Sequence, residues 1–248
     1  MKNKEVKMSQ RLHMVADMIT PELVVADIGT DHGYIPIYRI INGQSDYAYA
    51  CDVNEGPLKR AKENVINYGV EEHISLCLSD GLKNINIEDG HSIESIVIAG
   101  MGGGLICRIL KEGKAFVNDA DELILSPHSE VCEVRKYLYS IGMHIIAENM
   151  IREDGKYYVV LKAIHNEKNT TYNISELESL FGPCLLKEKN ACLIEYLNKE
   201  KDTCDKILCN LKKNGSEGSA MRVNEISRKK DEIVSALGIV AQRPYVHK

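Results

Sequence analysis

The chain has 248 residues, of which 44% are hydrophobic and 27% carry a charge. These proportions are typical of a folded globular protein and exclude a disordered chain or a fibrous repeat. The length exceeds that of one average domain, so we expect one large core with a smaller appendage. The net charge is −5, but residues 166–248 carry 14 basic against 12 acidic side chains. A nucleic acid is therefore expected to contact this second stretch rather than the first.

The sequence contains no uninterrupted apolar stretch of about 18 residues, and no apolar run follows its lysine-containing start. We therefore expect a cytoplasmic protein that neither spans a membrane nor is secreted. The eight cysteines include no Cys-x-x-Cys pair and lie among apolar neighbours, which favours buried free thiols over disulfides or zinc ligands. The histidines lack metal-ligand spacing, so no metal is expected.

Short apolar runs alternate with helical patterns along the first part of the chain. A leading helix is predicted after Ser9, and it ends at Thr20-Pro21. Strands are then predicted at 23–28, 47–53, 74–78, 95–99 and 122–126, and helices at 35–41, 57–68, 105–111 and 129–140. Such alternation is typical of a mostly parallel sheet covered by helices on both faces.

Two further strands are predicted at 144–151 and 156–163, on either side of Arg152-Glu153-Asp154-Gly155. The Asp-Gly pair is a strong signal for a hairpin turn. The predicted α/β sheet thus has seven strands, five wound with helices and two folded back as an antiparallel pair. This layout is closer to that of Rossmann-like methyltransferases than to that of a dehydrogenase.

Residues 165–173 are polar and are predicted to link this domain to a helical tail. A long helix is predicted over 187–213, ending at Asn214-Gly215, and a second helix follows it. Their apolar residues recur mostly at steps of three, four and seven, which predicts an antiparallel coiled-coil hairpin. These residues are Leu193, Leu197, Cys204, Leu208, Leu211, Ile226, Ile233 and Leu237. The predicted domains are 1–165 and 166–248.

A glycine-containing turn, Asp27-Ile28-Gly29-Thr30-Asp31-His32-Gly33, follows the first predicted strand. Open α/β sheets bind ligands at the carboxyl ends of their strands, and glycines let the backbone approach a ligand closely. The alternative is an ordinary strand-to-helix turn. Asp31 stands where a dinucleotide fingerprint has glycine, and Asp27 adds a second carboxylate. Two carboxylates repel a pyrophosphate but attract the sulfonium and ammonium groups of S-adenosyl-L-methionine (SAM), which argues against NAD.

Acidic residues also follow the second and third predicted strands. Asp52, with Val53 beside it, is placed to accept hydrogen bonds from the ribose hydroxyls of SAM. Asp80-Gly81 is placed to contact the adenine amine, although such a pair is more often only a turn. Acids after three consecutive strands support a ligand site at this edge of the sheet.

The sequence Ala99-Gly100-Met101-Gly102-Gly103-Gly104 after the fourth strand has four glycines within five positions. It offers a backbone-lined floor for a flat base, with Met101 as an apolar wall; the alternative is a flexible loop. Methyltransferases that act on exocyclic amines usually have here a polar residue, two prolines and an aromatic residue, which this chain lacks. A ring nitrogen is therefore favoured as the methyl acceptor, because it attacks without first losing a proton.

These motifs resemble those of the bacterial tRNA (adenine-22-N1)-methyltransferases, the TrmK family. The matching blocks are 27–36, 98–103, 123–127 followed by Arg135, 152–158, and 181–183 followed by 187–190. The resemblance implies a class I Rossmann-like domain with a coiled-coil tRNA-binding domain. It further implies SAM-dependent methylation of N1 of an adenine in the D-arm of tRNA, with S-adenosyl-L-homocysteine as the product of SAM and without a metal. Departures are minor, such as Thr30 in place of serine.

The resemblance also implies site residues. Those for the cofactor are Asp27, Gly29, Asp31, His32, Gly33, Asp52, Val53, Asp80, Gly81, Ala99, Gly100 and Met101. Those for the substrate are Met101, Gly102, Gly103, Pro127, Tyr157, Lys187 and Lys189. Asp31 and His32 are the catalytic candidates, although Asp31 is expected to serve the cofactor first and His32 has a purely structural alternative. No general base is expected, because attack by N1 releases no proton.

The target base must leave its stacked position before it reacts, and the tail is expected to hold the tRNA phosphates. Its candidate contacts are Lys187, Lys189, Lys199, Lys201, Lys206, Lys212, Lys213, Arg228, Lys229 and Lys230, for each of which a solvated helix face is the alternative. No obligate protein partner is implied. Two other functions stay open: a methyltransferase of small molecules or proteins, and a non-catalytic SAM- or RNA-binding module.

Overall fold

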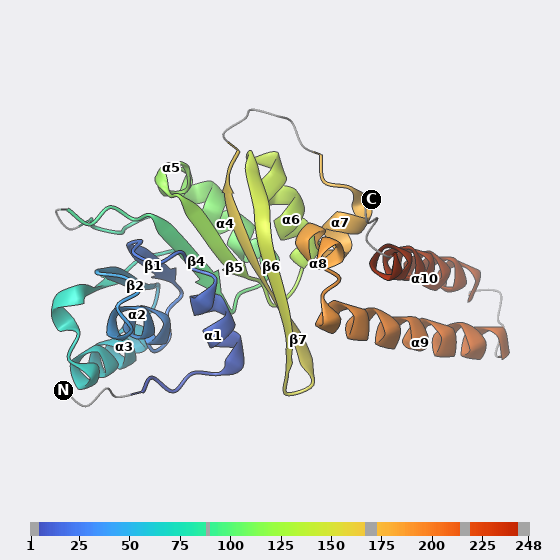
Figure 1. Ribbon diagram of the computed structural model, residues 1–248, viewed down its shortest axis with the longest axis horizontal. Coiled ribbons are helices and arrows are strands. Elements are labelled where there is room, and N and C mark those ends of the chain that lie inside the picture. Colours follow the sequence, from blue (N-terminus) through green and yellow to red (C-terminus); the bar gives the residue numbers. More distant parts are fainter. Residues whose placement is uncertain (1–4, 88–89, 167–172, 214–218, 243–248) are drawn as a thin grey trace, which may run out of the picture. The chain divides into compact units, whose positions relative to one another are not determined.

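The computed structural model describes residues 5–87, 90–166, 173–213 and 219–242. The chain forms two compact units, Met1–Asn173 and Ile174–Lys248, which are drawn together in Figure 1. The linker was predicted to begin at residue 165, but His165 still belongs to a strand, and its ring nitrogen Nε2 lies 2.9 Å from the carbonyl oxygen of Val117. Most of the predicted linker lies outside the described residues.

The first unit is built on a seven-stranded sheet with the order β3-β2-β1-β4-β5-β7-β6. The strands are β1 (Val25–Ile28), β2 (Ala48–Asp52), β3 (Ile74–Leu78), β4 (Ser95–Ala99), β5 (Glu122–Ser126), β6 (Met143–Glu153) and β7 (Lys156–His165). The first five run parallel, and β7 pairs antiparallel with both β5 and β6. Asp154 and Gly155 form the hairpin turn with positive φ angles of 49° and 78°. The predicted sheet with its terminal hairpin is confirmed.

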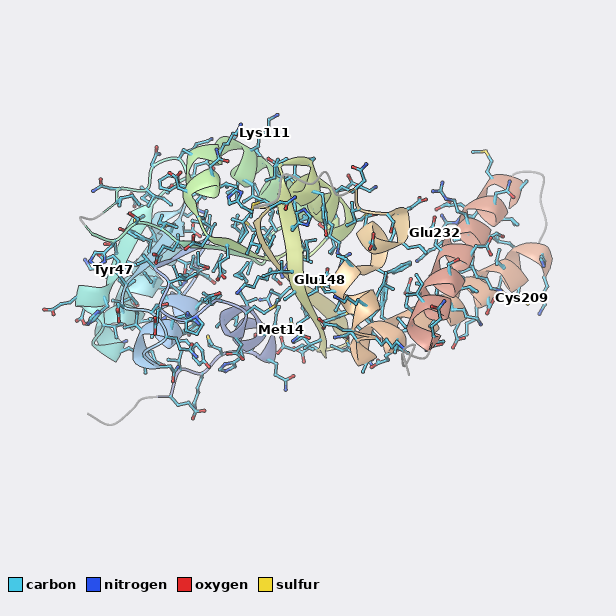
Figure 2. The ribbon with its side chains drawn as sticks, turned by 45° about the horizontal axis from the view of Figure 1, so that its top comes forward. Met14, Tyr47, Lys111, Glu148, Cys209 and Glu232 are labelled. Carbon is cyan, nitrogen blue, oxygen red and sulfur yellow. The ribbon has the colours of Figure 1, made fainter. Side chains whose placement is uncertain are left out.

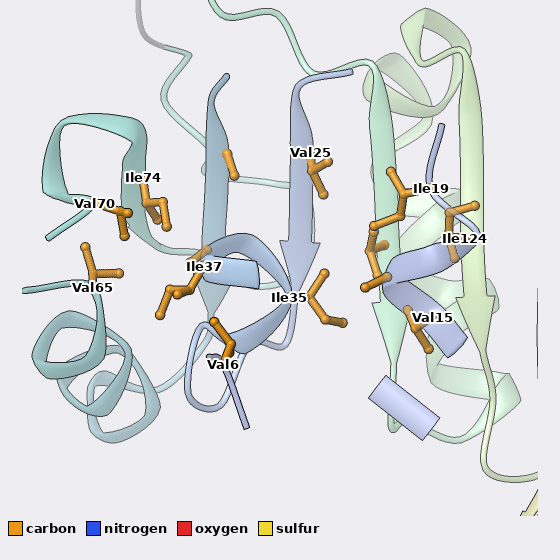
Figure 3. Packing of buried hydrophobic residues seen from close by; sticks show 14 of the residues in the cluster. Val6, Val15, Ile19, Val25, Ile35, Ile37, Val65, Val70, Ile74 and Ile124 are labelled. Carbon is orange, nitrogen blue, oxygen red and sulfur yellow. The ribbon is translucent and has the colours of Figure 1, made fainter. Parts of the chain in front are cut away.

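Helices cover both faces of this sheet (Figure 1). One face carries α1 (Gln10–Asp17), α2 (Tyr34–Ile41) and α3 (Glu55–Tyr68), and the other α4 (Gly103–Glu112), α5 (Lys114–Asp119) and α6 (Val131–Ser140). A short 3₁₀ helix, η1 (Glu71–His73), precedes β3. On the first face, Val15, Ile35 and Val65 of the helices belong to the same buried cluster as Val25 and Ile74 of the strands (Figure 3). The sequence did not predict α5, because six residues are too few for a clear helical period.

A buried arginine joins the end of α1 to α2. Arg39 is 1% exposed, and its guanidinium donates hydrogen bonds to the carbonyl oxygens of Ile19 at 3.1 Å, Thr20 at 2.7 Å and Gln44 at 2.7 Å. Carbonyls beyond the end of a helix have no partner within the helix, so this arginine satisfies groups that would otherwise be buried unpaired. It thereby holds α1 in place on the sheet.

The second unit is helical, with α7 (Glu176–Phe181), α8 (Pro183–Lys187), α9 (Ala191–Lys213) and α10 (Ser219–Ala241). The two long helices, α9 and α10, run antiparallel. The Lys189 ammonium, before α9, donates to the carbonyl of Gln242, after α10, while Glu200 and Lys229 form an ion pair at 2.6 Å farther along. Five of the predicted seam residues are buried, namely Leu193, Leu197, Cys204, Ile226 and Ile233, and the other three are half-buried.

The helix predicted over 187–213 is wrong at its start. The short α8 ends at Lys187, and α9 begins only at Ala191. Asn190 Oδ1 accepts the backbone N–H groups of Cys192 at 3.0 Å and Leu193 at 3.1 Å, so Asn190 caps α9. Lys189 has a φ of 54°, which no helix tolerates. The helix extends to Lys213 as predicted, and the predicted stop at Asn214-Gly215 lies outside the described residues.

None of the described helices is long and apolar enough to cross a membrane. All eight cysteines are free, and three of them are buried. The prediction of buried thiols is wrong for Cys209 on α9, which is exposed (Figure 2). At 100° per residue, Cys209 lies about 140° around the helix from the buried Cys204 and therefore faces solvent. No cluster of metal-ligating side chains occurs in the described ranges.

Candidate active site

The turn after β1 depends on its two glycines. Gly29 and Gly33 have φ angles of 80° and 69°, which residues with a side chain disfavour. The amides of Gly29 and Thr30 both donate to the carbonyl of Cys51 in β2, at 2.8 and 2.9 Å. Thr30 Oγ1 accepts the N–H of Gly33 at 3.2 Å. These bonds fix the turn against the neighbouring strand and leave its inner side to a cavity.

Asp27 is the buried acid of this cavity. Its side chain lies in β1, and the residue is only 5% exposed. Burial raises the pKa of Asp27 to about 6, a hydrogen bond from Thr30 opposes the shift, and the charge of Asp52 adds to it. Within the described residues, no basic side chain forms an ion pair with Asp27. A desolvated, uncompensated carboxylate in a cavity wall attracts a ligand cation strongly.

Asp31 and His32 lie in the same wall, but their side chains already have partners. Asp31 Oδ1 accepts a hydrogen bond from Nε of Arg60 at 3.1 Å, and Asp31 Oδ2 lies 3.3 Å from Nε2 of His32. The His32 ring stacks on Tyr34 with 5.2 Å between the ring centroids. Because Arg60 compensates Asp31, the preference for a cationic ligand rests on Asp27 alone and not on two free carboxylates. The sequence-based prediction of two free carboxylates in this turn is therefore wrong for Asp31.

Asp52 is the last residue of β2, the neighbour of β1, and Val53 follows it at the same edge of the sheet. Asp52 Oδ1 accepts the backbone N–H of Asn54 at 2.8 Å, which orients the carboxylate at the end of the strand. Val53 is 58% exposed. An acid beside an exposed aliphatic side chain offers hydrogen bonds to a ribose and an apolar surface to a flat base.

Asp80 and Gly81 follow β3. Asp80 forms an ion pair with Lys83 at 2.8 Å, and hydrogen bonding to this lysine lowers the pKa of Asp80. Gly81 has a φ of 65°, and a Cβ placed on it would lie 3.0 Å from the side chain of Ile109. The backbone conformation of Gly81 and its close packing against Ile109 therefore explain a glycine at this position without a ligand. Neither residue lines the cavity that contains Asp27.

The glycine-rich loop after β4 serves two purposes. Ala99 and Gly100 line the cavity, and Met101 extends over the first turn, since a Cβ on Gly29 would lie 2.0 Å from the methyl carbon of Met101. Gly102 and Gly103 instead face the loop after β5. Gly102 forms a β-bridge with Ser129, and a Cβ on Gly103 would lie 2.7 Å from the carbonyl oxygen of Glu130.

The crowding at Gly103 leads to a testable prediction. Gly103→Ala is expected to destabilise the protein by about 1–3 kcal/mol, because the new methyl group collides with rigid backbone. Gly104→Ala is the matched control, because its Cβ would meet only Glu130 Oε2, at 3.5 Å, and alanine favours a helix. Thermal unfolding should show a lower midpoint for the first variant and an equal or higher one for the second. Equal midpoints in both variants would contradict the close packing.

Two side chains that the sequence analysis missed, Arg11 and His128, also line the cavity. The cavity has a volume of about 350 Å³. It is lined by Arg11, Leu12, Asp27, Gly29, Thr30, Asp31, His32, Gly33, Tyr34, Ile35, Ala99, Gly100 and His128. Arg11 comes from the first turn of α1, and His128 follows β5 directly after the buried Pro127. The two are 117 residues apart in the chain, so no local motif joins them.

The remaining predicted substrate residues lie elsewhere. Tyr157 on β7 carries the guanidinium of Arg152 over its ring, at 5.7 Å from the centroid. Lys187 ends α8 in the second unit and is exposed. Lys189 is tied to the carbonyl of Gln242 within the same unit. None of these three residues lines the cavity.

The sequence model of the family described as "TrmK: tRNA (adenine(22)-N(1))-methyltransferase" matches residues 25–235. The chain belongs to the TrmK family. The tRNA (adenine(22)-N(1))-methyltransferase of Bacillus subtilis (strain 168) is 38% identical over 198 residues, which are 79% of this chain and 82% of that protein. The crystallised TrmK of M. capricolum, in complex with S-adenosyl-homocysteine, has a TM-score of 0.79 and 31% identity, covering 94% of this chain and 99% of that one.

Streptococcus pneumoniae Sp1610 in complex with SAM superimposes with a TM-score of 0.80 and 31% identity, covering 93% of this chain and all of that one (100%). Membership of the TrmK family confirms the resemblance noted from the motifs. It also confirms the Rossmann-like methyltransferase fold with added C-terminal helices. The TrmK fold places its buried acid, its glycine turn and its glycine-rich loop around one cavity at the carboxyl edge of the sheet.

Proposed function

We propose that this TrmK protein transfers a methyl group from SAM to N1 of adenine 22 in the D-arm of tRNA. The observation that carries the proposal is Asp27, a buried carboxylate without a basic partner among the described residues, in a cavity lined by a glycine turn. Its charge suits the ammonium and sulfonium groups of SAM. The name of the B. subtilis relative supplies the substrate, which the cavity alone does not specify.

The cavity and the neighbouring strand ends, where Asp52, Val53 and Asp80 lie outside the cavity lining, fit SAM in three parts. Asp27 and the backbone of Gly29, which both line the cavity, would hold the methionine portion. Asp52 would accept the ribose hydroxyls, and the exposed Val53 would lie against the adenine. Asp80 would reach the adenine amine only by giving up part of its pairing with Lys83.

The chemistry requires positioning more than proton transfer. SAM supplies an activated methyl group, and the N1 lone pair forms the new N–C bond as the S–C bond breaks, leaving S-adenosyl-L-homocysteine and a cationic base. Because no proton leaves N1, the reaction does not require Asp31 or His32 to act as a general base. Asp31 instead contacts both His32 and Arg60, and these contacts hold the first turn in shape. Ala99 and Gly100 have little or no side chain, so this part of the wall would admit a flat base edge-on.

The second unit would supply tRNA phosphate contacts, but its cations are unequal. Five of the predicted contacts already have partners within the unit: Lys189 donates to a backbone carbonyl, and Lys201, Arg228, Lys229 and Lys230 pair with carboxylates. By contrast, Lys206, Lys212 and Lys213 of α9 are exposed and have no ion pair within the described ranges. These three, which we call the α9 lysine cluster, would hold phosphate groups. We also propose a cytoplasmic location, which a tRNA substrate supports.

Primer extension on tRNA tests this function. An N1-methylated adenine cannot form a Watson–Crick pair, so reverse transcriptase should stop next to position 22 after incubation with the protein and SAM. Incubation without SAM is the control and should give full-length products. Methylation of proteins or metabolites with no stop on any tRNA would contradict the proposed substrate, and SAM binding without any methyl transfer would contradict an enzyme.

A further inference from the structure

Arg11 is held at the cavity by three neighbouring groups. Glu153 Oε1, at the end of β6, accepts the backbone N–H groups of Gln10 at 2.8 Å and Arg11 at 3.4 Å, which anchors the start of α1 to the hairpin. The Arg11 guanidinium lies 5.1 Å from the ring centroid of Tyr158 on β7. It also donates a hydrogen bond to His128 Nε2. Helix, hairpin and the loop after β5 thus converge on one cation.

The imidazole of His128 is kept neutral beside this arginine. Desolvation lowers the pKa of His128, and the positive charges of Arg11 and Lys156 lower it further. Because the guanidinium has only donors, Nε2 must be the acceptor, and the ring proton resides on Nδ1. The backbone N–H of His128 donates to the carbonyl of Met101 at 2.8 Å, so the backbone that carries the ring is tied to the glycine-rich loop.

The cavity therefore has opposite charges on different parts of its wall. The carboxylate of Asp27 is 5% exposed, whereas His128 and Gly100, beside the guanidinium, are exposed at the rim. One hydrogen bond to His128 uses one of the five N–H donors of Arg11, and no carboxylate is ion-paired with it among the described residues. A cation in this state would repel the sulfonium of SAM, but it matches an anionic oxygen entering at the rim.

On the basis of the proposed function, we propose that Arg11 binds a phosphate group of the target nucleotide, and that His128 is the positioning residue that aims the guanidinium. The nucleotide carries its own phosphate into the cavity with the base, so one contact at the rim sets how deeply the base enters. Tyr158 supports the flat face of the guanidinium and leaves its edge for the phosphate oxygens. SAM also has an anionic group, its carboxylate, which is the competing occupant.

Steady-state kinetics on tRNA with Arg11→Met test the proposal. The KM for tRNA should rise about tenfold at 0.1 M salt. In a plot of log KM against the logarithm of the salt concentration, the slope should fall by about one, as expected for one lost phosphate contact. The Kd for SAM should stay unchanged in calorimetry, which also shows that the variant is folded. Arg11→Lys should recover part of the loss, because it keeps the charge but not the planar fork.

His128 is tested through its dependence on Arg11. His128→Leu should raise the KM for tRNA, and His128→Gln, which keeps an acceptor for the guanidinium, should restore it. The Arg11→Met/His128→Leu double variant should be no worse than Arg11→Met, since His128 acts through Arg11. Lys62→Met on α3, which removes an exposed positive charge outside the cavity lining, is the control and should leave KM unchanged.

Two results would overturn this inference while leaving the proposed function intact. One is an Arg11→Met variant that methylates tRNA with the wild-type KM and salt dependence. The other is a loss of SAM affinity with no change for tRNA, which would assign Arg11 to the carboxylate of SAM. If the wild-type protein itself gives no stop at adenine 22, the proposed function fails first, and the two failures are thus distinguishable.

Discussion

Replacing Asp27 by asparagine is expected to stabilise the protein at neutral pH and to weaken its binding of SAM. Asp27 is 5% exposed, and its pKa is raised from 3.8 to about 6, chiefly by burial. The folded state therefore binds a proton more tightly than the unfolded state does. Ionising the buried carboxylate above pH 6 costs the folded state up to about 3 kcal/mol, which asparagine removes while keeping the shape of the side chain.

The sign of this effect defines its pH window. The penalty is absent below about pH 4, where Asp27 is protonated in both states, grows between about pH 4 and 6, and is complete above that range. Urea unfolding of wild type and Asp27→Asn should therefore give similar stabilities at pH 4 and a more stable variant at pH 7.5. Asp46→Asn changes an exposed aspartate and should alter stability by less than about 0.5 kcal/mol at either pH.

Binding of SAM should respond in the opposite direction. A charge-assisted hydrogen bond contributes about 1.5–3 kcal/mol, so the Kd of Asp27→Asn for SAM should rise about 10- to 100-fold in calorimetry. For the wild type, SAM should bind more weakly at pH 5 than at pH 7.5 and should release protons near pH 6, because the ligand cation favours the ionised carboxylate. If the Asp27→Asn variant is more stable but keeps full SAM affinity, Asp27 does not contribute to SAM binding.

Much of the fold follows from the sequence because the central parallel strands are almost entirely buried and therefore appear as short apolar runs. Apolar runs with abrupt polar ends predicted β3, β4 and β5 with the bounds that the structure shows. The start of α9 was missed because apolar residues continue at helical spacing through residues 184–193, and this period hides the break. The cap at Asn190 was the available signal, since asparagine is a favoured N-cap residue.

The site was predictable only in its local parts. The glycine turn and the acids after β1, β2 and β3 were visible because each belongs to a short segment that ends a strand. Arg60, which compensates Asp31, is 29 positions away from it, and Arg11 meets His128 across 117 positions. Pairings of this kind depend on how the helices lie on the sheet. The sequence thus predicted which ligand the edge attracts but overstated its negative charge.

The second large effect is expected in the α9 lysine cluster. Replacing Lys206, Lys212 and Lys213 together by alanine should weaken tRNA binding by about 100-fold or more at 0.1 M salt. Each phosphate contact releases close to one counterion, which corresponds to about a tenfold gain in affinity at that salt concentration. The exposed ammonium groups of the cluster have no ion pair in the described part of the chain, so a phosphate meets no competing carboxylate.

The matched control removes three lysines that already have carboxylate partners. Lys201 and Lys230 pair with Asp205 at 3.0 and 2.5 Å, and Lys229 pairs with Glu200 at 2.6 Å. The triple alanine variant of these lysines has the same net charge as the cluster variant, yet its tRNA affinity should fall only a few-fold. Filter binding across a salt series should show a slope reduced by about three for the cluster variant alone. An equal loss of tRNA affinity in both variants would contradict this prediction and would mean that tRNA binding depends on the overall charge of the second unit. The affinity for SAM should be unchanged in both variants.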